Sequence, residues 1–318
     1  MADWCELMKK LSKKLTCLLF LLSLAFPSPS LSGEKLGFGI LPVVDVLPLL
    51  VGKETGLFEK EGIDLELISF QSALERDAAL QSGRLDGYFG DILNTVLLIQ
   101  SGEQLRIIAT AFHTHPRCRM FGIAVAPGSG ITDLDGIQGK DVAISSATVI
   151  EYLLDRMLSA RNIPAGNVTK QEIKKIPIRL QMLLSAQVTA ALLPEPLLTL
   201  AETHGSKVIV DDRNLDTALT VLAVNLKHRP AIIALIPRFL KAYNTAVDKI
   251  NANPSDFKEI LITKTQFPPD VRNKYPVPVF PTGSLPPEAD VLAVQEWLIK
   301  NNLIKTRISY ADMVIAGQ

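Results

Sequence analysis

The chain has 318 residues, 47% of which are hydrophobic, and its 33 lysines and arginines balance its 33 acidic residues. This length exceeds that of one ordinary domain and suits two lobes of roughly 100 to 200 residues each. The zero net charge argues against a polyanion or a charged membrane surface as the main partner, so we expect no nucleic-acid binding. Only Cys118 lies outside the N-terminal segment, and an exported chain would therefore have no intramolecular disulfide.

The first 32 residues have the composition of an export signal. Four lysines precede the apolar run Leu15 to Phe26, and small residues before Gly33 suit a cleavage site. The run is shorter than the about 20 residues that span a bilayer, so we expect a cleaved signal and an extracytoplasmic or periplasmic protein. A retained anchor is the alternative. Met1 and Met8 are both candidate starts, because the residues between them add acidic side chains to a region that should be basic.

A strand passes into a helix around Gly90 and Asp91. Residues 85–89 have the length and flanking glycines of a buried strand, while residues 92–100 place apolar side chains at helical spacings. Gly90 can take a tight turn that a side chain would resist, and the Asp91 carboxylate can accept a bond from a free amide at the helix start. In an open α/β sheet such corners lie along one edge, where ligands bind. We therefore expect this corner to form part of a pocket.

Strands and helices alternate through the first part of the chain. Ser72 and Glu75 form a capping box that opens the helix after the second strand. Such a run of strand–helix units demands a mostly parallel sheet with helices on both faces. The expected strands are 36–41, 63–70, 85–89 and 105–111.

A second lobe is expected after the break Pro127-Gly128-Ser129-Gly130, which follows an extended run at 121–126. In that lobe, Thr148 and Glu151 form another capping box at the start of a helix with one apolar side. The extended run 217–225 precedes a helical remainder and indicates a return to the first lobe. The expected boundaries are 33–123 for the first lobe, 124–222 for the second and 223–318 for the return.

The helical remainder begins with apolar residues that step by three and four from Ile233 to Ile250. Pro237 should kink this helix or restart it, because proline lacks the amide that an interior helical position donates. The proline-rich region from Pro268 to Pro287 is expected to be a long loop or a cover on the first lobe.

Four motifs, taken in order, resemble those of a known family. They are residues 52–64 (GKETGLFEKEGID), 82–87 (SGRLDG), 190–196 (AALLPEP) and the tail pattern at 238–254. The chain resembles the periplasmic solute-binding proteins of ABC importers, in the branch for nitrate, sulfonate, taurine and thiamine precursors. The resemblance implies an α/β, two-lobe periplasmic-binding-protein type II fold. Each lobe would be a mostly parallel sheet flanked by helices, two crossing strands would join the lobes, and a ligand cleft between them would close on binding.

Ligand contacts are expected where strands end and helices begin, because helix N-termini present free amides to polar groups. Asp45 is the first choice, since Pro48 rather than Asp45 marks the helix entry. Ser72, Asp91, Thr148 and Glu195 can equally serve as caps or complement a helix dipole, and both roles stay open. The candidate ligand-binding residues are Val44, Asp45, Phe70, Gln71, Ser72, Gly90, Asp91 and His113 in the first lobe, and Ser145, Ser146, Thr148 and Glu195 in the second.

Catalytic and metal-binding patterns are absent from the sequence, and we expect no cofactor. There is no Gly-x-Ser-x-Gly, P-loop or dinucleotide fingerprint. His113 and His115 would share one face of a strand, but a metal site needs further ligands and only Cys118 is near. No catalytic or metal-ligating residue is therefore predicted.

The charge of the candidate residues bears on the ligand. If Asp45, Asp91 and Glu195 face the cleft, their carboxylates would repel an anion by about 1 kcal/mol or more per contact. A neutral or cationic nitrogen-rich solute is therefore favoured over an anion. Arg117 and Arg119 leave the opposite reading open, because they could neutralise the acids or clamp an anion.

The leading prediction is an exported, monomeric solute receptor that captures a small polar molecule and delivers it to an ABC permease with a cytoplasmic ATPase. The alternative is an enzyme of thiamine-pyrimidine or menaquinone biosynthesis, since proteins similar to this one include such enzymes. Those enzymes are cytoplasmic, and the export signal argues against them here. A sensor ectodomain is a third possibility, which the lack of a fused output domain disfavours.

Overall fold

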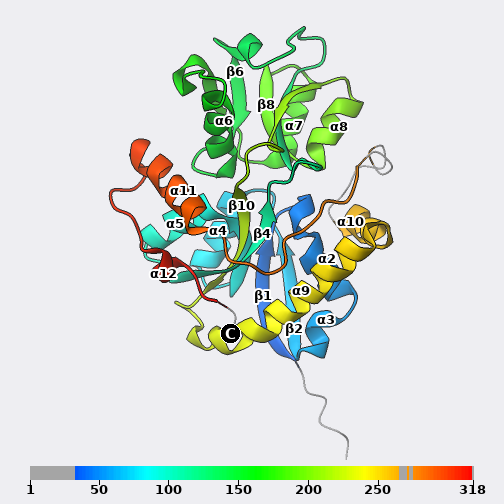
Figure 1. Cartoon of the computed structure of the whole chain (residues 1–318), viewed down its shortest axis with the longest axis vertical. Helices are drawn as coiled ribbons and strands as arrows, with labels where there is room; N and C mark the ends of the chain where they lie inside the picture. The colour runs from blue at the N-terminus through cyan, green and yellow to red at the C-terminus, as the bar shows by residue number, and fades with distance from the viewer. Residues whose placement is uncertain (1–32, 265–270, 272–274, 317–318) are drawn as a thin grey trace, which may run out of the picture. The chain divides into compact units, whose positions relative to one another are not determined.

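The computed structural model describes residues 33–264, 271 and 275–316. The predicted export signal at residues 1–32 lies outside these residues, as does part of the proline-rich region. The described residues form two five-stranded sheets, each flanked by helices (Figure 1).

The first sheet has the strand order β2-β1-β3-β10-β4. β1 runs parallel to β2 and β3, whereas β10 is antiparallel to both of its neighbours, β3 and β4. Every residue of β3 and β10 is buried, as expected for central strands covered on both faces. The strands are β1 (Glu34–Ile40), β2 (Ile63–Ser69), β3 (Gly87–Asp91), β4 (Leu105–His113) and β10 (Ala218–Asn225). Helices in this part of the chain are α2 (Leu47–Glu54), α3 (Leu57–Lys60), α4 (Ala73–Gln81) and α5 (Ile92–Gln100), with a short 3-10 helix η1 (Val44–Val46).

The second sheet repeats this arrangement with the order β7-β6-β8-β5-β9. β6 is parallel to β7 and β8, and β5 is the strand antiparallel to its neighbours β8 and β9. The strands are β5 (Phe121–Val125), β6 (Asp141–Ile144), β7 (Thr169–Glu172), β8 (Ala190–Pro194) and β9 (Lys207–Asp211). The helices are α6 (Val149–Ser159), α7 (Ile176–Leu184) and α8 (Leu197–Thr203), with the short 3-10 helices η2 (Asp135–Ile137) and η3 (Ala165–Asn167). The predicted two-lobe α/β fold with mostly parallel sheets is thus confirmed.

The two crossings lie earlier in the chain than expected. β5 belongs to the second sheet and β10 to the first, so the chain passes between sheets at residues 114–120 and again at 212–217. The passage expected at Pro127–Gly130 is therefore wrong, because that break is a turn within the second half. The boundaries expected at 123/124 and 222/223 fall inside β5 and β10 for the same reason. The crossings bond to each other, since the amide of Thr217 donates to Thr114 Oγ1 at 2.8 Å and that of Met120 to Asp212 Oδ1 at 2.9 Å.

The helical return packs against the first sheet. Pro237 is at the start of α9 (Ile236–Ala252), directly after η4 (Pro230–Leu235), so proline restarts the helix instead of kinking it. The Phe239 ring lies 5.4 Å from that of Phe38 in β1 and 5.1 Å from that of Phe58 in α3. The remaining elements are η5 (Pro254–Phe257), α10 (Lys258–Lys264), α11 (Glu288–Lys300) and α12 (Tyr310–Met313).

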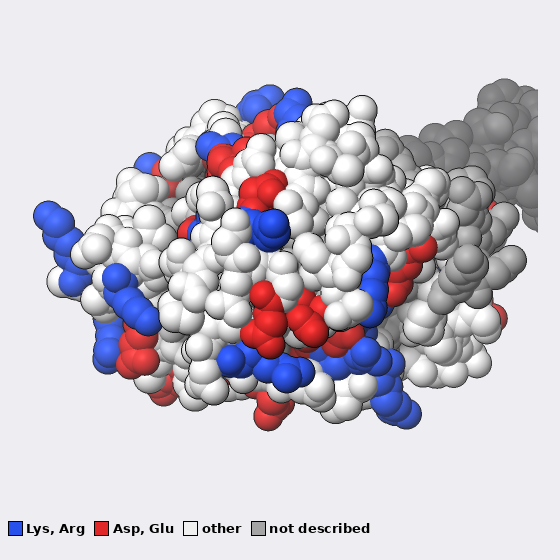
Figure 2. All heavy atoms as spheres, turned by 90° about the horizontal axis from the view of Figure 1, so that it is seen from above, with Lys and Arg blue, Asp and Glu red and all other residues white. Residues whose placement is uncertain are grey.

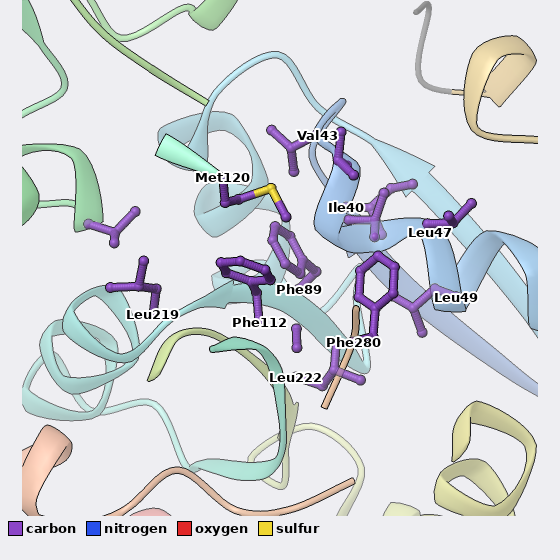
Figure 3. Packing of buried hydrophobic residues seen from close by; sticks show 14 of the residues in the cluster. Ile40, Val43, Leu47, Leu49, Phe89, Phe112, Met120, Leu219, Leu222 and Phe280 are labelled. Carbon is purple, nitrogen blue, oxygen red and sulfur yellow. The ribbon is translucent and has the colours of Figure 1, made fainter. Parts of the chain in front are cut away.

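Apolar side chains fill the space where the first sheet meets the first crossing. Phe89 of β3, Phe112 of β4 and Met120 of the crossing are all buried and group together in Figure 3. Each such side chain stabilises the fold by roughly 1.5–3 kcal/mol through burial. This packing holds the carboxyl ends of β3 and β4 in fixed positions close to the second half.

Candidate functional site

A pocket with a cavity volume of about 50 Å³ lies between the two sheets. Both halves contribute to it, mainly through the corners at which strands lead into helices. Such corners present helix N-termini, whose free amides suit polar ligands. From the first half and β10 the lining residues are Leu41, Val43, Asp45, Ala73, Arg76, Phe89, Gly90, Asp91 and Thr220, and from the second half Phe121, Ser145, Thr148, Val149, Ile150, Lys174, Ile176, Arg179 and Pro194.

Asp45 is the lining carboxylate with the fewest protein contacts. It lies in η1 and is 1% exposed. Its Oδ2 accepts a bond of 2.8 Å from Thr220 Oγ1, whereas Oδ1 has no bond from another residue in the described part of the chain. Burial raises the pKa of Asp45 to about 7, against the lowering effect of the Thr220 hydroxyl and its own amide. A buried acceptor without a donor is costly, so this oxygen suits a donor on a ligand.

Asp91 connects the two halves. Its Oδ1 accepts the amide of Asn94 at 2.7 Å, which caps α5 as predicted, and its Oδ2 accepts the amide of Val149 at the start of α6, at 3.4 Å. Burial raises the pKa of this carboxyl to about 6. One carboxylate therefore serves two helix N-termini, one in each half, and lines the pocket as well.

Gly90 is required for space rather than for a turn. Its φ angle is not among the positive ones, so the predicted tight-turn role is wrong. A Cβ at this position would lie 2.0 Å from the Tyr88 ring, which occupies the same side of the strand. The Tyr88 ring also lies against the Arg76 guanidinium, 4.5 Å from ring centre to Cζ. Glycine thus leaves room for the Tyr88 ring and exposes backbone to the pocket.

The loop before α6 forms part of the opposite wall. Ser145 and Thr148 line the pocket, and Thr148 Oγ1 accepts the Ile150 amide as the cap of α6. Glu151 accepts the Ala147 amide at 2.8 Å rather than the Thr148 amide, so Thr148 caps α6 but the reciprocal bond of the predicted capping box is shifted by one residue. Ala147 has a left-handed backbone with φ of 56°, a conformation that costs free energy in a residue with a side chain.

Each half also places a buried arginine at the pocket. Arg76 of α4 donates to Asp77 Oδ1, to Asn94 Oδ1 and to the Phe89 carbonyl, so its charge is neutralised within the protein. Arg179 of α7 is fully buried and donates to the carbonyls of Ile173 and Leu192.

Arg179 differs from Arg76 because it makes no ion pair with any described residue. Burial lowers its pKa to about 10, and only a longer-range attraction to Glu172 opposes this. Two of its five N–H groups remain after the three bonds to carbonyls. The exposed Lys174, 3.9 Å from Glu172, adds a second cation to this wall.

Five of the predicted site residues line the pocket, namely Asp45, Gly90, Asp91, Ser145 and Thr148. Several others lie next to it without lining it. The Val44 amide donates to the Glu195 carbonyl at 3.3 Å, and the Ile176 amide to the Gln71 carbonyl at 3.4 Å, so both residues join the halves. Ser72 caps α4, Ser146 bonds to Glu172, and half-buried Phe70 packs with the core. His113 bonds to the carbonyl of Thr114.

Glu195 faces away from the pocket, contrary to prediction. It is fully buried, and its carboxylate accepts bonds from Arg119 Nε at 2.7 Å and from the amide and hydroxyl of Thr199. Arg119 also pairs with Glu202. Glu195 thereby ties the first crossing to α8 and borders a second hollow, together with Arg117, Cys118 and Arg213.

Sequence reasoning missed the two arginines, although the pattern contained a signal. Arg179 follows Ile176 by three residues and precedes Leu183 by four, so it falls on the apolar face of its helix. Arg76 precedes Ala79 and Leu80 in the same way. A charged residue on an otherwise apolar helix face is a candidate for a buried, functional side chain. Thr220 and Lys174 carried no comparable signal.

In the described part of the chain, no three His, Cys, Asp or Glu side chains are arranged to hold a metal ion. None of its helices is both long enough and apolar enough to cross a bilayer. Acidic and basic side chains lie next to one another on the face shown in Figure 2, so this face presents no extended surface of one sign.

A family model described as NMT1/THI5 like matches residues 44–257, more than half of the chain. The chain belongs to the NMT1/THI5-like family. The match begins at the η1 corner with Asp45 and ends after α9. It therefore contains every residue that lines the pocket except Leu41 and Val43.

The chain is similar to one curated protein named for solute binding and, in fold, to a solved binding protein and a solved enzyme. A protein of Bacillus subtilis (strain 168), whose name proposes aliphatic sulfonates as its ligand, is 27% identical over 212 residues, 63% of this chain. The chain spans 61% of that relative's length. The alkanesulfonate-binding protein SsuA from Xanthomonas axonopodis pv. citri, solved with MOPS, is similar with a TM-score of 0.76 and 17% identity, over 90% of this chain and 99% of that one. The desulfurization enzyme DSZB has a TM-score of 0.65 and 16% identity, over 89% and 96%.

Proposed function

We propose that this chain is the solute-binding component of an ABC importer. The observation that carries the proposal is a pocket between the two halves, lined by strand-to-helix corners of both. It contains two buried charged groups, Asp45 and Arg179, whose hydrogen-bonding capacity the described residues leave partly unused. A small solute with polar groups would satisfy these groups. The similarity to a relative named for sulfonate binding and to the SsuA fold supports this function.

Closure of the two halves would follow from contacts that a solute makes with both. The halves already touch around the pocket through the Val44, Val149 and Ile176 amides, at 3.3 to 3.4 Å. A solute that contacts Asp45 on one side and Arg179 on the other binds the closed arrangement more tightly than an open one. That difference in affinity shifts the population toward closure, which a permease can recognise.

The partners follow from this function. A membrane permease with an ATPase would take the solute. The expected export signal at residues 1–32 would place the protein outside the cytoplasm, where we expect it to act as a monomer. The mixed surface charge on the face shown in Figure 2 fits a small solute better than a polyanion.

The charge of the solute needs revision from the sequence-based expectation. That expectation rested on three carboxylates, but Glu195 is turned away and paired with Arg119. The pocket also contains the cations Lys174 and Arg179. An anionic group can therefore be accommodated, consistent with the sulfonate named for the relative.

Binding is favoured over catalysis by the residues that line the pocket. Histidine is the commonest general base and cysteine the most reactive nucleophile, and neither is among the described lining residues. Ser145 and Thr148 are held in local structure, since Thr148 Oγ1 donates to the Ser145 carbonyl at 2.7 Å. The fold shared with DSZB keeps an enzyme as the second candidate.

A thermal-shift screen of the purified full chain against sulfonates, nitrate, amines, amino acids, pyrimidines and flavins tests the function. We expect at least one class of solute to raise the melting temperature and to shrink the radius of gyration in small-angle scattering. Solute turnover without release of intact ligand would instead favour the enzyme. A screen in which no solute binds would overturn the receptor function.

A further inference from the structure

The two halves place one arginine each at the same point of the same substructure. Arg76 is the fourth residue of α4 and donates at 2.7 Å to the carbonyl of Phe89, the third residue of β3. Arg179 is the fourth residue of α7 and donates at 3.2 Å to the carbonyl of Leu192, the third residue of β8. β3 and β8 hold the same central place in their sheets. Arg76 and Arg179 are therefore structural equivalents, and both line the pocket.

Among the described residues, only the first of these arginines forms an ion pair, and Arg179 is left with a longer-range attraction to Glu172. Asp77 follows Arg76, whereas Leu180 follows Arg179. The side-chain amide oxygen of Asn94, five residues after Phe89, accepts from Arg76 at 2.6 Å, whereas the residue five positions after Leu192 is Leu197. A buried guanidinium without an anion is strongly unfavourable, so an anion that enters from the pocket would offset this cost.

The opposite wall has the complementary deficit. Asp45 Oδ1 is buried without a bond from another described residue, and Asp91 Oδ2 receives only the long Val149 bond of 3.4 Å. Both carboxylates belong to the first half. In the second half, Arg179 has no ion pair with a described residue, whereas Lys174 lies 3.9 Å from Glu172. The uncompensated charges of the pocket are thus separated by half, with Asp45 and Asp91 on one side and Arg179 on the other.

We propose that the solute is a zwitterion, whose anionic group lies against Arg179 and whose protonated nitrogen lies against Asp45 and Asp91. This inference rests on the proposed solute-binding function. A solute with only an anionic group would satisfy Arg179 but leave the Asp45 oxygen without a donor. A solute with only a cationic group would do the reverse. A solute with both charges compensates both walls and bridges the two halves, which makes its binding energy depend on closure.

Isothermal titration of the full chain with three solutes that share a three-carbon chain tests the inference. The compound 3-aminopropane-1-sulfonate carries both charges, propane-1-sulfonate only the anion and propylammonium only the cation. We expect the first to bind at least tenfold more tightly than either of the others. Propane-1-sulfonate that binds equally well overturns the zwitterion but leaves the receptor function standing. If the thermal-shift screen finds that only solutes with one charge or none bind, and that no zwitterion binds, the zwitterion proposal is likewise overturned and the receptor function stands.

Two variants separate the two ends of the solute. Asp45→Asn keeps the size of the side chain and should weaken 3-aminopropane-1-sulfonate at least tenfold while leaving propane-1-sulfonate within threefold. Arg179→Lys keeps a charge but loses the planar fork, and should weaken both sulfonates alike. Asp64→Asn, at an exposed position of β2, is the matched control and should change neither affinity. Equal weakening of both sulfonates by Asp45→Asn would overturn the assignment, and the three-solute series on the unaltered chain remains decisive if a variant fails to fold.

Discussion

The two halves of this NMT1/THI5-like protein share a strand order but treat the same buried charge differently. The first half neutralises Arg76 with Asp77 and Asn94, whereas the second leaves Arg179 bonded only to backbone carbonyls. The corners that follow β3 and β8, the third strands in the two sheet orders, show the opposite contrast, because here the acidic side chain of the second half is the paired one. Asp91, the last residue of β3, faces the pocket, while Glu195, the residue that follows β8, is turned to Arg119. In the proposed receptor, a repeated scaffold becomes a binding site because each half leaves one charge for the solute to compensate.

The largest expected effect is on the free energy of unfolding of the protein without solute, for which substitutions of the two arginines should differ. Arg76→Met should lower the free energy of unfolding by about 3–5 kcal/mol, because Asp77 is left buried without its partner. Arg179→Met should cost at most about 2 kcal/mol, since lost bonds to carbonyls are partly offset by removal of an isolated charge. Urea denaturation of both variants without solute measures the difference. Equal costs would mean that Arg179 has a counter-charge within the protein.

The acidic wall should give stability an unusual dependence on pH. Burial raises the pKa of Asp45 to about 7 in the folded protein, against about 3.9 when unfolded. The folded state holds this proton more tightly than the unfolded state does. Protonated Asp45 therefore makes its full contribution to the free energy of unfolding below about pH 4, and this contribution is lost as the pH rises to about 7. In Asp45→Asn, the decrease in the free energy of unfolding between pH 4 and 7 should be smaller by roughly 2–4 kcal/mol than in the unaltered protein. Denaturation curves across this range check it, and an unchanged slope would contradict the raised pKa.

A smaller effect concerns the contact of α11 with the second half. α11 packs on α5 (Figure 1). Trp297 Nε1 nevertheless donates to Asp155 Oδ2 of α6 at 3.0 Å, and the Trp297 ring meets that of Tyr152 edge-on. Trp297→Phe keeps a ring but removes the donor. We expect solute affinity to fall about threefold to tenfold, because this bond exists only when the halves are together. Titration calorimetry measures it, and an unchanged affinity would show that the contact does not favour closure.

The smallest effect is expected at the surface pair between the halves. Lys175 Nζ lies 3.2 Å from Glu75 Oε1, and both side chains are substantially exposed. Lys175→Ala should change solute affinity by less than about twofold, because water and salt screen exposed pairs. Repeating the titration in 0.05 and 0.5 M salt gives the control. A larger loss would place this pair among the contacts that hold the halves closed.

Much of the fold could be predicted because local patterns and tertiary structure agree. The helix caps at Ser72, Asp91 and Thr148 and the restart at Pro237 depend on neighbours within four residues, and the structure contains each of them. The crossings could not be placed in this way. Strands β5 and β10 look alike in sequence whichever sheet they join, and only pairing across more than 60 residues assigns them.

The site was predicted less completely for the same physical reason. Strand-to-helix corners are visible in sequence, so Asp45, Gly90, Asp91, Ser145 and Thr148 could be proposed as pocket residues. The direction of a corner side chain depends on distant partners. Glu195 is turned away by Arg119, which lies 76 residues earlier in the chain. The role of each residue toward a solute stays a prediction until binding is measured.

The place of Trp297 has a spectroscopic consequence. The sequence contains two tryptophans, and the other, Trp4, lies within the segment expected to be removed on export. The processed chain would then carry a single indole, half-buried beside Tyr152 and bonded across the two halves. Its emission should shift to longer wavelength when the halves separate and water reaches the ring, so opening and closing could be followed in real time without any attached dye.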